Sequence, residues 1–330
     1  MKKTLSVVIP AYKRPVLLDK SIDSIFNSSR NYPVEILVMD DSLGSENDWV
    51  YKKYNDRGEN LRVIKNSRNL GIDANICSCI ENAITDYVWL MGEDDLMRER
   101  GISAAMAVID EGGAVPFIYA NYSYITADQK KVLREKSVEI SGKDIDFAIF
   151  FEKYLWSAGF IGGCIIHRNS FLATNYRDFI STYFAHVAGI CLSSRGKKIA
   201  VIAEAQVCNR VGDASTFTWS ADFHGVFQGW RKMLAMLRPE FGTEAYMKSY
   251  SSHVRAHGYL GFKFLASKKA DGLLARSDIA MLVAGNVSFA ERCRIQLVAI
   301  FIPSAACKLL RSIYADARRM KLATLNLLER

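Results

Sequence analysis

Short apolar runs alternate with amphipathic stretches along the first hundred residues. Four runs have the length and β-branched composition of buried strands, and they lie at 5–9, 34–39, 61–64 and 87–91. Two stretches between them carry apolar residues at helical spacing, at 15–26 and 72–83. Strands that alternate with helices at this rhythm predict an α/β fold with a doubly wound, mostly parallel sheet.

The second half of the chain changes character near residue 220. Before that point, further strands are predicted at 115–124, 160–167 (around a glycine pair) and 199–207. From residue 222 onward the pattern is helical, with aromatic and basic residues mixed. We therefore predict two regions, an α/β domain over 1–220 and a helical C-terminal region over 221–330.

Composition narrows the classes of protein. Half of the 330 residues are hydrophobic and 24% are charged, which excludes a disordered chain and allows a large core. The formal net charge of +8 favours anionic partners, namely nucleic acid, an acidic membrane surface or phosphorylated small molecules. Seven cysteines without a CxxC pair argue against a disulfide framework or a zinc site, and so indicate a reducing, cytoplasmic location.

Polar clusters follow three of the predicted strands, at 10–14, 40–42 and 93–95. In open α/β sheets, ligands bind beyond the carboxyl ends of the strands. One acidic strand end would be explained by a helix N-cap, but two such ends beside a third with an aromatic and cations favour a ligand site. Glu93 and Asp95 offer the oxygen ligands that Mg²⁺ or Mn²⁺ prefers. Such a cation would bridge to phosphates and neutralise a leaving diphosphate.

Four segments together resemble the signature blocks of family 2 glycosyltransferases, which have the GT-A fold. They are LSVVIPAYKRPVLLDKSIDSI, EILVMDDS, NLGIDANI and YVWLMGEDD, in the family's order and at its usual separations. The resemblance covers roughly the first 100 residues well and 160–215 more loosely. It implies a glycosyltransferase with a nucleotide-sugar donor and a divalent cation, Mn²⁺ or Mg²⁺.

The resemblance also implies roles for individual residues. A loop around the donor nucleotide would be formed by Pro10, Ala11, Tyr12 and Arg14. Asp41 would hydrogen-bond a pyrimidine base, with Asp40 as its support, and Asn69 and Gly71 would close over the base and ribose. Asp94 would contact the ribose, and Asp95 would bind the metal together with Glu93. Tyr12 as a packing aromatic and Gly71 as a turn glycine are the alternatives.

One block departs from the family. Inverting members carry a pair of acids that includes the catalytic base, and the alignment places this pair at Ala185 and His186. The chain has no carboxylate between Asp178 and Glu204. His186 is therefore either the base, since its ordinary pKa suits proton abstraction near neutrality, or an interior or acceptor-site histidine. Inversion and retention of the anomeric configuration both stay open.

Two basic features remain. Arg210 lies where the family often has a loop over the diphosphate, and the alternative is an ordinary polar connection. Residues 291–330 carry eight Lys or Arg against three Asp or Glu, after an apolar stretch at 295–302. A basic, amphipathic segment that is too short to span predicts contact with an anionic membrane surface. A helix packed on the core with a solvated basic face is the alternative.

Together these features predict a glycosyltransferase, peripheral on the inner face of the plasma membrane. The donor would be UDP-, dTDP- or CDP-linked, and the acceptor a saccharide, lipid-linked as in O-antigen synthesis. A deoxy- or dideoxyhexose such as abequose is one candidate sugar. A nucleic-acid-binding protein would explain the charge but not the acidic strand ends, so we expect no nucleic acid partner. A nucleotidyltransferase would normally require a glycine-rich phosphate loop after the first strand, and PAYKRP has no glycine.

Overall fold

The chain forms two compact units, Met1–Ala245 and Tyr246–Arg330. The computed structural model describes residues 3–111, 114–211, 223–274, 276–284 and 287–313. The boundary predicted near residue 220 lies outside the described residues. The first helix after it, α8 (Phe223–Phe241), falls within the first unit.

The described part of the first unit contains a ten-stranded sheet in the order β3-β2-β1-β4-β9-β6-β10-β5, with β7 beside β6 and β8 beside β10. Neighbours among β3, β2, β1 and β4 are parallel, as are β6 and β10. β9 is antiparallel to both β4 and β6, and β5 is antiparallel to β10. The predicted mostly parallel sheet is confirmed. The strands are β1 (Leu5–Ala11), β2 (Glu35–Asp40), β3 (Leu61–Lys65), β4 (Tyr87–Leu90), β5 (Leu96–Met97), β6 (Phe117–Thr126), β7 (Val132–Arg134), β8 (Asp144–Asp146), β9 (Cys164–His167) and β10 (Lys198–Val211).

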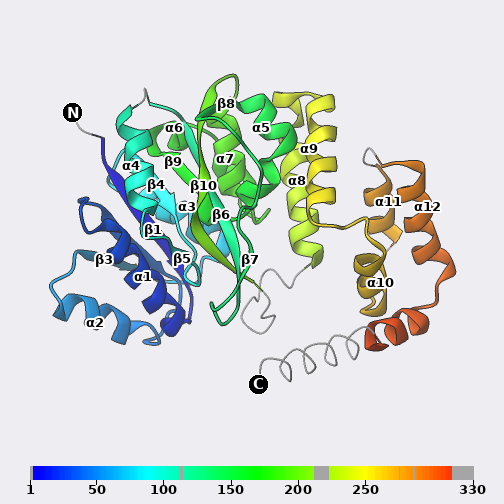
Figure 1. Cartoon of the computed structure of the whole chain (residues 1–330), viewed down its shortest axis with the longest axis horizontal. Coiled ribbons are helices and arrows are strands. Elements are labelled where there is room, and N and C mark those ends of the chain that lie inside the picture. Colours follow the sequence, from blue (N-terminus) through cyan, green and yellow to red (C-terminus); the bar gives the residue numbers. More distant parts are fainter. Residues whose placement is uncertain (1–2, 112–113, 212–222, 275, 285–286, 314–330) are drawn as a thin grey trace. The chain divides into compact units, whose positions relative to one another are not determined.

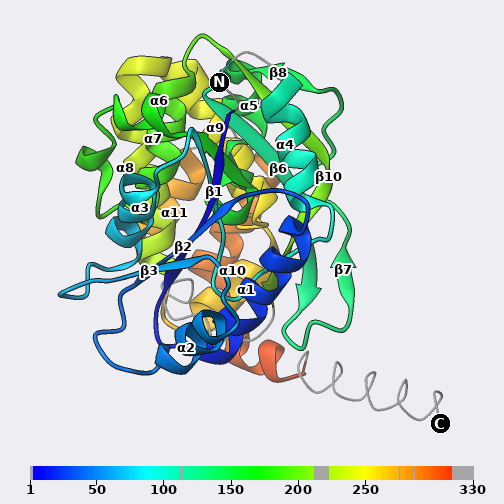
Figure 2. The same ribbon diagram turned by 90° about the vertical axis from the view of Figure 1, so that its left-hand side faces the viewer.

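Helices cover both faces of this sheet. On one face α1 contacts α2 and α4, and on the other α3 contacts α6 and α7. Figure 1 labels the strands and helices in chain order. Figure 2 shows α3, α6 and α7 on one side of β1 and α1 and α4 on the other. The helices are α1 (Pro15–Ser29), α2 (Asp48–Asp56), α3 (Ile72–Asn82), α4 (Gly101–Glu111), α5 (Phe147–Lys153), α6 (Arg168–Leu172), α7 (Ala185–Ser194), α8, α9 (Thr243–Ala256), α10 (Phe262–Ala270), α11 (Arg276–Ala284) and α12 (Phe289–Gln296).

The central strands are buried because both of their faces are covered. Every residue of β1 and of β4 is buried, which is why these strands are continuous apolar runs rather than alternating ones. The buried Trp89 of β4 still donates its indole N–H to the carbonyl of Gly162, at 2.9 Å. Pro15 begins α1, where its missing N–H leaves no intrahelical bond unmade.

Two later strands differ from the prediction. The strand predicted at 160–167 begins only at Cys164, because Ile161–Gly163 forms a 3₁₀ turn. β10 runs beyond the predicted 199–207 and contains a bulge, in which five steps from Ile202 to Val207 match two steps along β6. The extension carries Arg210 into the strand.

The second unit is helical in its described residues. α12 continues into a π-helical turn, Leu297–Phe301, and a further helix covers Ser304–Ile313. No single described helix is long and apolar enough to cross a bilayer, although Phe289–Phe301 and Ser304–Ile313, bent by 108°, meet that criterion as a pair in length and composition.

Candidate active site

The carboxyl ends of the parallel strands meet at one edge of the sheet. Ala11 at the end of β1 is paired with Asp40 at the end of β2, which is paired with Lys65 of β3. Beyond β4, the N–H of Met91 donates to the carbonyl of Val8 in β1, at 2.9 Å. Figure 2 shows β1, β2 and β3 side by side. The polar clusters after β1, β2 and β4 therefore share this edge, as the strand pattern predicts.

The segment after β1 leads toward the acidic turn. Pro10 and Ala11 are buried in the strand, whereas the side chain of Tyr12 is 41% exposed. Arg14 stands immediately before α1, and its Nη1 donates to Oδ2 of Asp94 at 3.2 Å. The predicted donor loop thus combines a solvent-facing ring with a guanidinium that is held in place by a carboxylate.

Asp94 joins two cations from different strands. Its Oδ2 also accepts a hydrogen bond from Nη2 of Arg210 in β10, at 3.2 Å. The Arg210 side chain is only 3% exposed. Arg210 therefore belongs to the buried end of β10 and not to the loop that follows. The rest of that loop, including Ser215 and Thr216, lies outside the described residues. Two guanidinium groups consequently face one carboxylate at the edge where a ligand would bind.

Glu93 turns back toward β1. Its Oε2 accepts the N–H of Tyr12 at 2.7 Å, and its Oε1 lies 3.5 Å from Nε of Arg14. Burial raises the pKa of Glu93 to about 8, although the Tyr12 N–H and the Arg14 guanidinium act in the opposite direction. Glu93 therefore fixes the start of the loop after β1.

Asp95 turns instead toward β10. Its Oδ1 accepts the backbone N–H of Arg210 at 3.2 Å. Burial, and then the charge of Asp94, raise the pKa of the Asp95 carboxyl well above its ordinary value. Gly92 makes this arrangement possible, because a Cβ at that position would lie 2.2 Å from Oδ2 of Asp95.

The carboxylates of the acidic turn differ in how well they could bind a divalent cation. Glu93 and Asp95 contact different strand ends, and the part of the chain that the structure describes holds no cluster of three or more His, Cys, Asp or Glu arranged for a metal. Asp94 is neutralised by two arginines, whereas no described residue forms an ion pair with Asp95. Asp95 therefore fits a cation that takes most of its ligands from phosphate and water, as Mg²⁺ commonly does.

Asp40 has a structural role in the described structure. Its carboxylate accepts hydrogen bonds from the N–H of Ser42 (3.0 Å), Nδ2 of Asn47 (3.1 Å) and the hydroxyl of Tyr51 (2.8 Å). Burial, and then the charge of Asp40, raise the pKa of Tyr51. The sequence did not reveal Asn47 and Tyr51, because nothing local distinguishes them from other polar residues at the start of a surface helix.

Asp41 holds the loop that precedes α3. Its carboxylate accepts the N–H groups of Leu70 (2.8 Å to Oδ1) and Gly71 (3.0 Å), and Nδ2 of Asn66 (3.0 Å). Oδ1 of Asn69 also accepts the Gly71 N–H, at 2.8 Å. Gly71 has a φ of +78°, which favours glycine there. Asp41, Asn69 and Gly71 thus come together as the resemblance implies, while their contact with a nucleotide stays a prediction.

His186 lies in the first turn of α7 and is buried. Its Nε2 lies 3.3 Å from the carbonyl oxygen of Ala158, and no described residue is a partner of its Nδ1. Burial lowers the pKa of His186 to about 4, although the contact with Ala158 acts the other way. A neutral, enclosed imidazole is a weak base at neutral pH, so these features favour the interior histidine over the catalytic base.

Asp73 places a carboxylate next to Ala185, at the position where the family's acid pair aligns with Ala185 and His186. It lies in the first turn of α3, and its Oδ1 accepts the N–H of Ala185 at 2.9 Å. Burial raises its pKa, although backbone N–H groups lower it. Asp73 had no assigned role from sequence, because its partners lie more than a hundred residues away and an acid in a first helical turn is ordinary.

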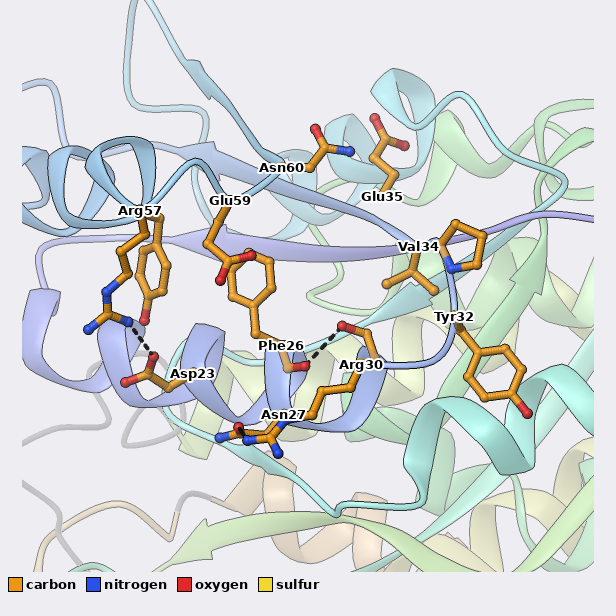
Figure 3. Close-up of a pocket in the computed structure, with 13 residues that line it drawn as sticks. Asp23, Phe26, Asn27, Arg30, Tyr32, Val34, Glu35, Arg57, Glu59 and Asn60 are labelled. Carbon is orange, nitrogen blue, oxygen red and sulfur yellow. Dashed lines mark hydrogen bonds and ion pairs between the residues drawn. The ribbon is translucent and has the colours of Figure 1, made fainter.

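A cavity of about 590 Å³ lies elsewhere in the described structure. Figure 3 shows Phe26, Tyr32, Glu35 and Arg57 around it. Glu35 begins β2, so this cavity is at the amino ends of the strands, away from the carboxyl edge. It contributes nothing to the site described above.

Comparison with known proteins identifies the family. The sequence profile of glycosyl transferase family 2 matches residues 6–174, from β1 beyond the acidic turn to the end of α6. This chain belongs to glycosyl transferase family 2. It is therefore a glycosyltransferase. The family supports this interpretation of the sequence over the two alternatives, a nucleic-acid-binding protein and a nucleotidyltransferase.

The relatives of this glycosyltransferase include proteins with named activities. The GalNAc(5)-diNAcBac-PP-undecaprenol beta-1,3-glucosyltransferase of Campylobacter jejuni is 23% identical over 264 residues, 77% of this chain and 82% of that protein. The abequosyltransferase of Salmonella typhimurium is 28% identical over 109 residues, 32% of each chain. The chain thus spans about a third of one relative and four fifths of the other.

Solved structures share the fold. Residues 1–349 of Staphylococcus aureus TarS, in complex with UDP, superpose with a TM-score of 0.60 at 14% identity, covering 96% of this chain and 91% of that one. A mannosyltransferase of Pyrobaculum calidifontis, in complex with GDP-Man and Mn²⁺, gives 0.51 at 14% identity, covering 94% and 87%. The predicted GT-A fold is confirmed.

Proposed function

We propose that this glycosyltransferase moves a sugar from a pyrimidine nucleoside-diphosphate donor to a hydroxyl of a lipid-linked saccharide. The observation that carries the donor site is the sheet edge where Asp41, Asp94 and Asp95 lie with Arg14 and Arg210. Carboxylates suit the hydrogen-bond donors of a base and a ribose, and guanidinium groups suit a diphosphate. The UDP complex of TarS supports the pyrimidine.

The base would bind at the loop that Asp41 holds. An ionised carboxylate has about four lone-pair sites, and Asp41 already uses most of them on Asn66, Leu70 and Gly71. We infer that Asp41 contributes one bond to the base at most and acts mainly by shaping the loop. Tyr12, exposed at the neighbouring strand end, would pack against the nucleotide.

The reaction breaks the bond between the anomeric carbon and the diphosphate while the acceptor hydroxyl forms a new one. Negative charge gathers on the departing diphosphate, and Arg14 and Arg210 would stabilise it, which their shared ion pairs with Asp94 support by holding both guanidinium groups at this edge. A divalent cation bound through Asp95 would supply further neutralisation. NMR of the product's anomeric configuration decides between inversion, which needs a base for the hydroxyl proton, and retention.

A thermal-shift series tests the donor site. We expect UDP, dTDP or CDP with Mn²⁺ to raise the melting temperature by mass action more than GDP does. Asp41→Asn should remove most of the shift. Asp86→Asn is the matched control, because the Asp86 carboxylate also accepts a backbone N–H, that of Thr4, but at the amino edge of the sheet. A shift from GDP as large as that from the pyrimidines, or one unchanged in Asp41→Asn, would refute the assignment.

The acceptor is proposed to be lipid-linked partly because of the second unit. Its last described helices expose large apolar side chains, led by Phe289 at 83% and Phe301 at 72%. Cations accompany them, whereas Ile295 and Val298 face the interior. Apolar and basic side chains that are exposed together fit an anionic bilayer surface. The exposed set comprises Phe289, Leu297, Ile300, Phe301, Leu309, Leu310 and Ile313 with Arg292, Arg294, Lys308 and Arg311.

Co-sedimentation with vesicles of phosphatidylglycerol and phosphatidylethanolamine tests this surface. The pair Ile300→Ser and Phe301→Ser should reduce the bound fraction at any salt concentration. Arg292→Glu with Lys308→Glu should reduce it mainly at low salt, since each basic side chain contributes about 1 kcal/mol near such a surface. Val132→Ser with Leu133→Ser, also exposed but on β7, is the control. Equal binding by all variants would exclude these helices as the contact.

A further inference from the structure

Asp73 reaches across the molecule to the backbone in front of α7. Its Oδ2 accepts the N–H groups of Thr182 and Tyr183, at 3.1 and 3.0 Å, and its Oδ1 accepts that of Ala185, at 2.9 Å. The carboxylate is buried and bridges 109 to 112 positions of sequence. Three N–H bonds on one buried carboxylate define a rigid link between α3 and the segment that we call the 181–185 segment.

The 181–185 segment is strained. Ser181 has a φ of +85° and Tyr183 a φ of +67°, a region that side chains with a Cβ rarely occupy. Each such residue costs on the order of 1–3 kcal/mol and persists only where the surroundings over-determine it. Asp73 supplies part of that constraint. α8 supplies another part, because a Cβ on Gly229 would lie 2.1 Å from the carbonyl oxygen of Thr182.

The same turn of chain is tied to the donor side. Leu70 and Gly71 donate their N–H groups to Asp41, and Asp73 follows only two residues after Gly71. Gly71 is the N-cap of α3, so no flexible linker separates the two anchors. Hydrogen bonds therefore join Asp41 to residues 70–71 and Asp73 to the 181–185 segment, and the backbone from Gly71 to Asp73 connects the two sets of bonds.

We propose that Asp73 is a positioning residue that couples the nucleotide loop at 66–71 to the 181–185 segment, so that donor binding sets the backbone in front of α7, where the alignment places the family's acid pair. The inference rests on the proposed donor site at Asp41. Asp73 does not touch the substrate, since its bonds go to backbone N–H groups. A nucleotide that orders the loop holds Asp73 in place, and Asp73 in turn holds the strained turn before α7.

A simpler role is possible for the same bonds. A carboxylate at the N-terminus of α7 stabilises the helix through its dipole and its unpaired N–H groups. That role predicts a loss of stability when Asp73 is changed, but no response of the 181–185 segment to a nucleotide. The two roles therefore differ in an observable that does not depend on turnover.

Hydrogen exchange measured by mass spectrometry, with and without UDP and Mn²⁺, tests the coupling. In the unaltered protein, UDP should slow exchange severalfold in peptides over 66–72 and also in peptides over 181–187. In Asp73→Asn, whose amide cannot accept all three N–H groups, UDP should still protect 66–72 but no longer 181–187. Asp86→Asn should behave like the unaltered protein.

The outcomes separate the hypotheses. Protection of 66–72 without protection of 181–187 in the unaltered protein overturns the coupling, even if Asp73→Asn does not fold. Equal protection of 181–187 in the unaltered protein and in Asp73→Asn also overturns it and leaves Asp73 as a helix cap. No protection at 66–72 by UDP, dTDP or CDP refutes the proposed donor site, and the coupling with it.

Discussion

Asp41 and Asp73 anchor backbone segments in the same way, one before α3 and the other before α7. Each is a buried carboxylate that accepts N–H groups from a segment distant in sequence, the 66–71 loop for Asp41 and the 181–185 segment for Asp73. Both lie inside recognisable blocks, Asp41 at the end of β2 and Asp73 in the first turn of α3. The resemblance implies a role for Asp41 alone, yet the two carboxylates anchor backbone in the same way.

Asp95 differs from both, because we propose that it binds a metal ion as well as accepting the backbone N–H of Arg210. Asp95→Asn should lower kcat by about 10²-fold or more, since a neutral amide holds a cation less well and several kcal/mol of charge stabilisation depend on it. The measurement is steady-state turnover in saturating Mn²⁺, with circular dichroism to confirm folding. Full activity in excess EDTA, or in Asp95→Asn, would remove the metal role.

Asp41→Asn should weaken UDP binding by about tenfold or more, since hydrogen bonds to a charged group contribute about 1.5–3 kcal/mol each. Asp73→Asn should change the same Kd by much less, because its bonds lie one step further from the nucleotide. Isothermal titration calorimetry of both variants measures the difference. An Asp73→Asn variant with the larger loss would reverse the assignment of the two sides.

The double variant sharpens the comparison further. If the two carboxylates act through residues 70–73, the effects of Asp41→Asn and Asp73→Asn on UDP affinity should not add, with a coupling energy of about 0.5–3 kcal/mol. Asp41→Asn with Asp86→Asn should be additive. Additivity in both double variants would mean that the anchors act independently.

His186→Gln should have the smallest effect on turnover, within a few-fold in kcat, if His186 is an interior residue. Its folded pKa of about 4 lies below the ordinary value near 6.5. The buried neutral ring therefore contributes stability that is complete above about pH 6.5 and is lost as the pH falls toward 4. Denaturant unfolding between pH 7 and 4 should show a shallower loss in His186→Gln. A thousandfold fall in kcat would restore His186 as the base.

The sheet was predictable from sequence where strands are buried on both faces. β1, β2 and β4 are continuous apolar runs with polar ends, so pattern alone places both the strands and the clusters at their ends. β5, only Leu96–Met97, is too short to leave a pattern. The prediction began the strand at 160 rather than at Cys164, because Phe160 and Ile161 continue its apolar pattern although Ile161–Gly163 forms a 3₁₀ turn.

The site was predictable only as far as its contacts are local in sequence. Asp41, Asn69 and Gly71 belong to neighbouring blocks, and their association follows from the order of the strands. Arg210 was expected in a loop, because no pattern announces the bulge that lengthens β10. The bonds of Asp73 to the 181–185 segment depend on how α3 packs on α7, which a single sequence does not encode as a motif.

The bulge in β10 determines on which face of the sheet the Arg210 side chain lies. Between Ile202 and Val207 the strand has three residues more than β6 needs, and an odd surplus exchanges the two faces of a strand, whose side chains alternate. Even-numbered residues before the bulge therefore lie on the same face of the sheet as odd-numbered residues after it, and Arg210 lies on the other face. The pairing of Val207 with Tyr122 and of Arg210 with Ile125 sets the face on which Arg210 lies. A change in the length of the bulge that shifted this pairing by one residue would turn the Arg210 side chain away from Asp94, so variant libraries should keep the pairing after Val207 unchanged.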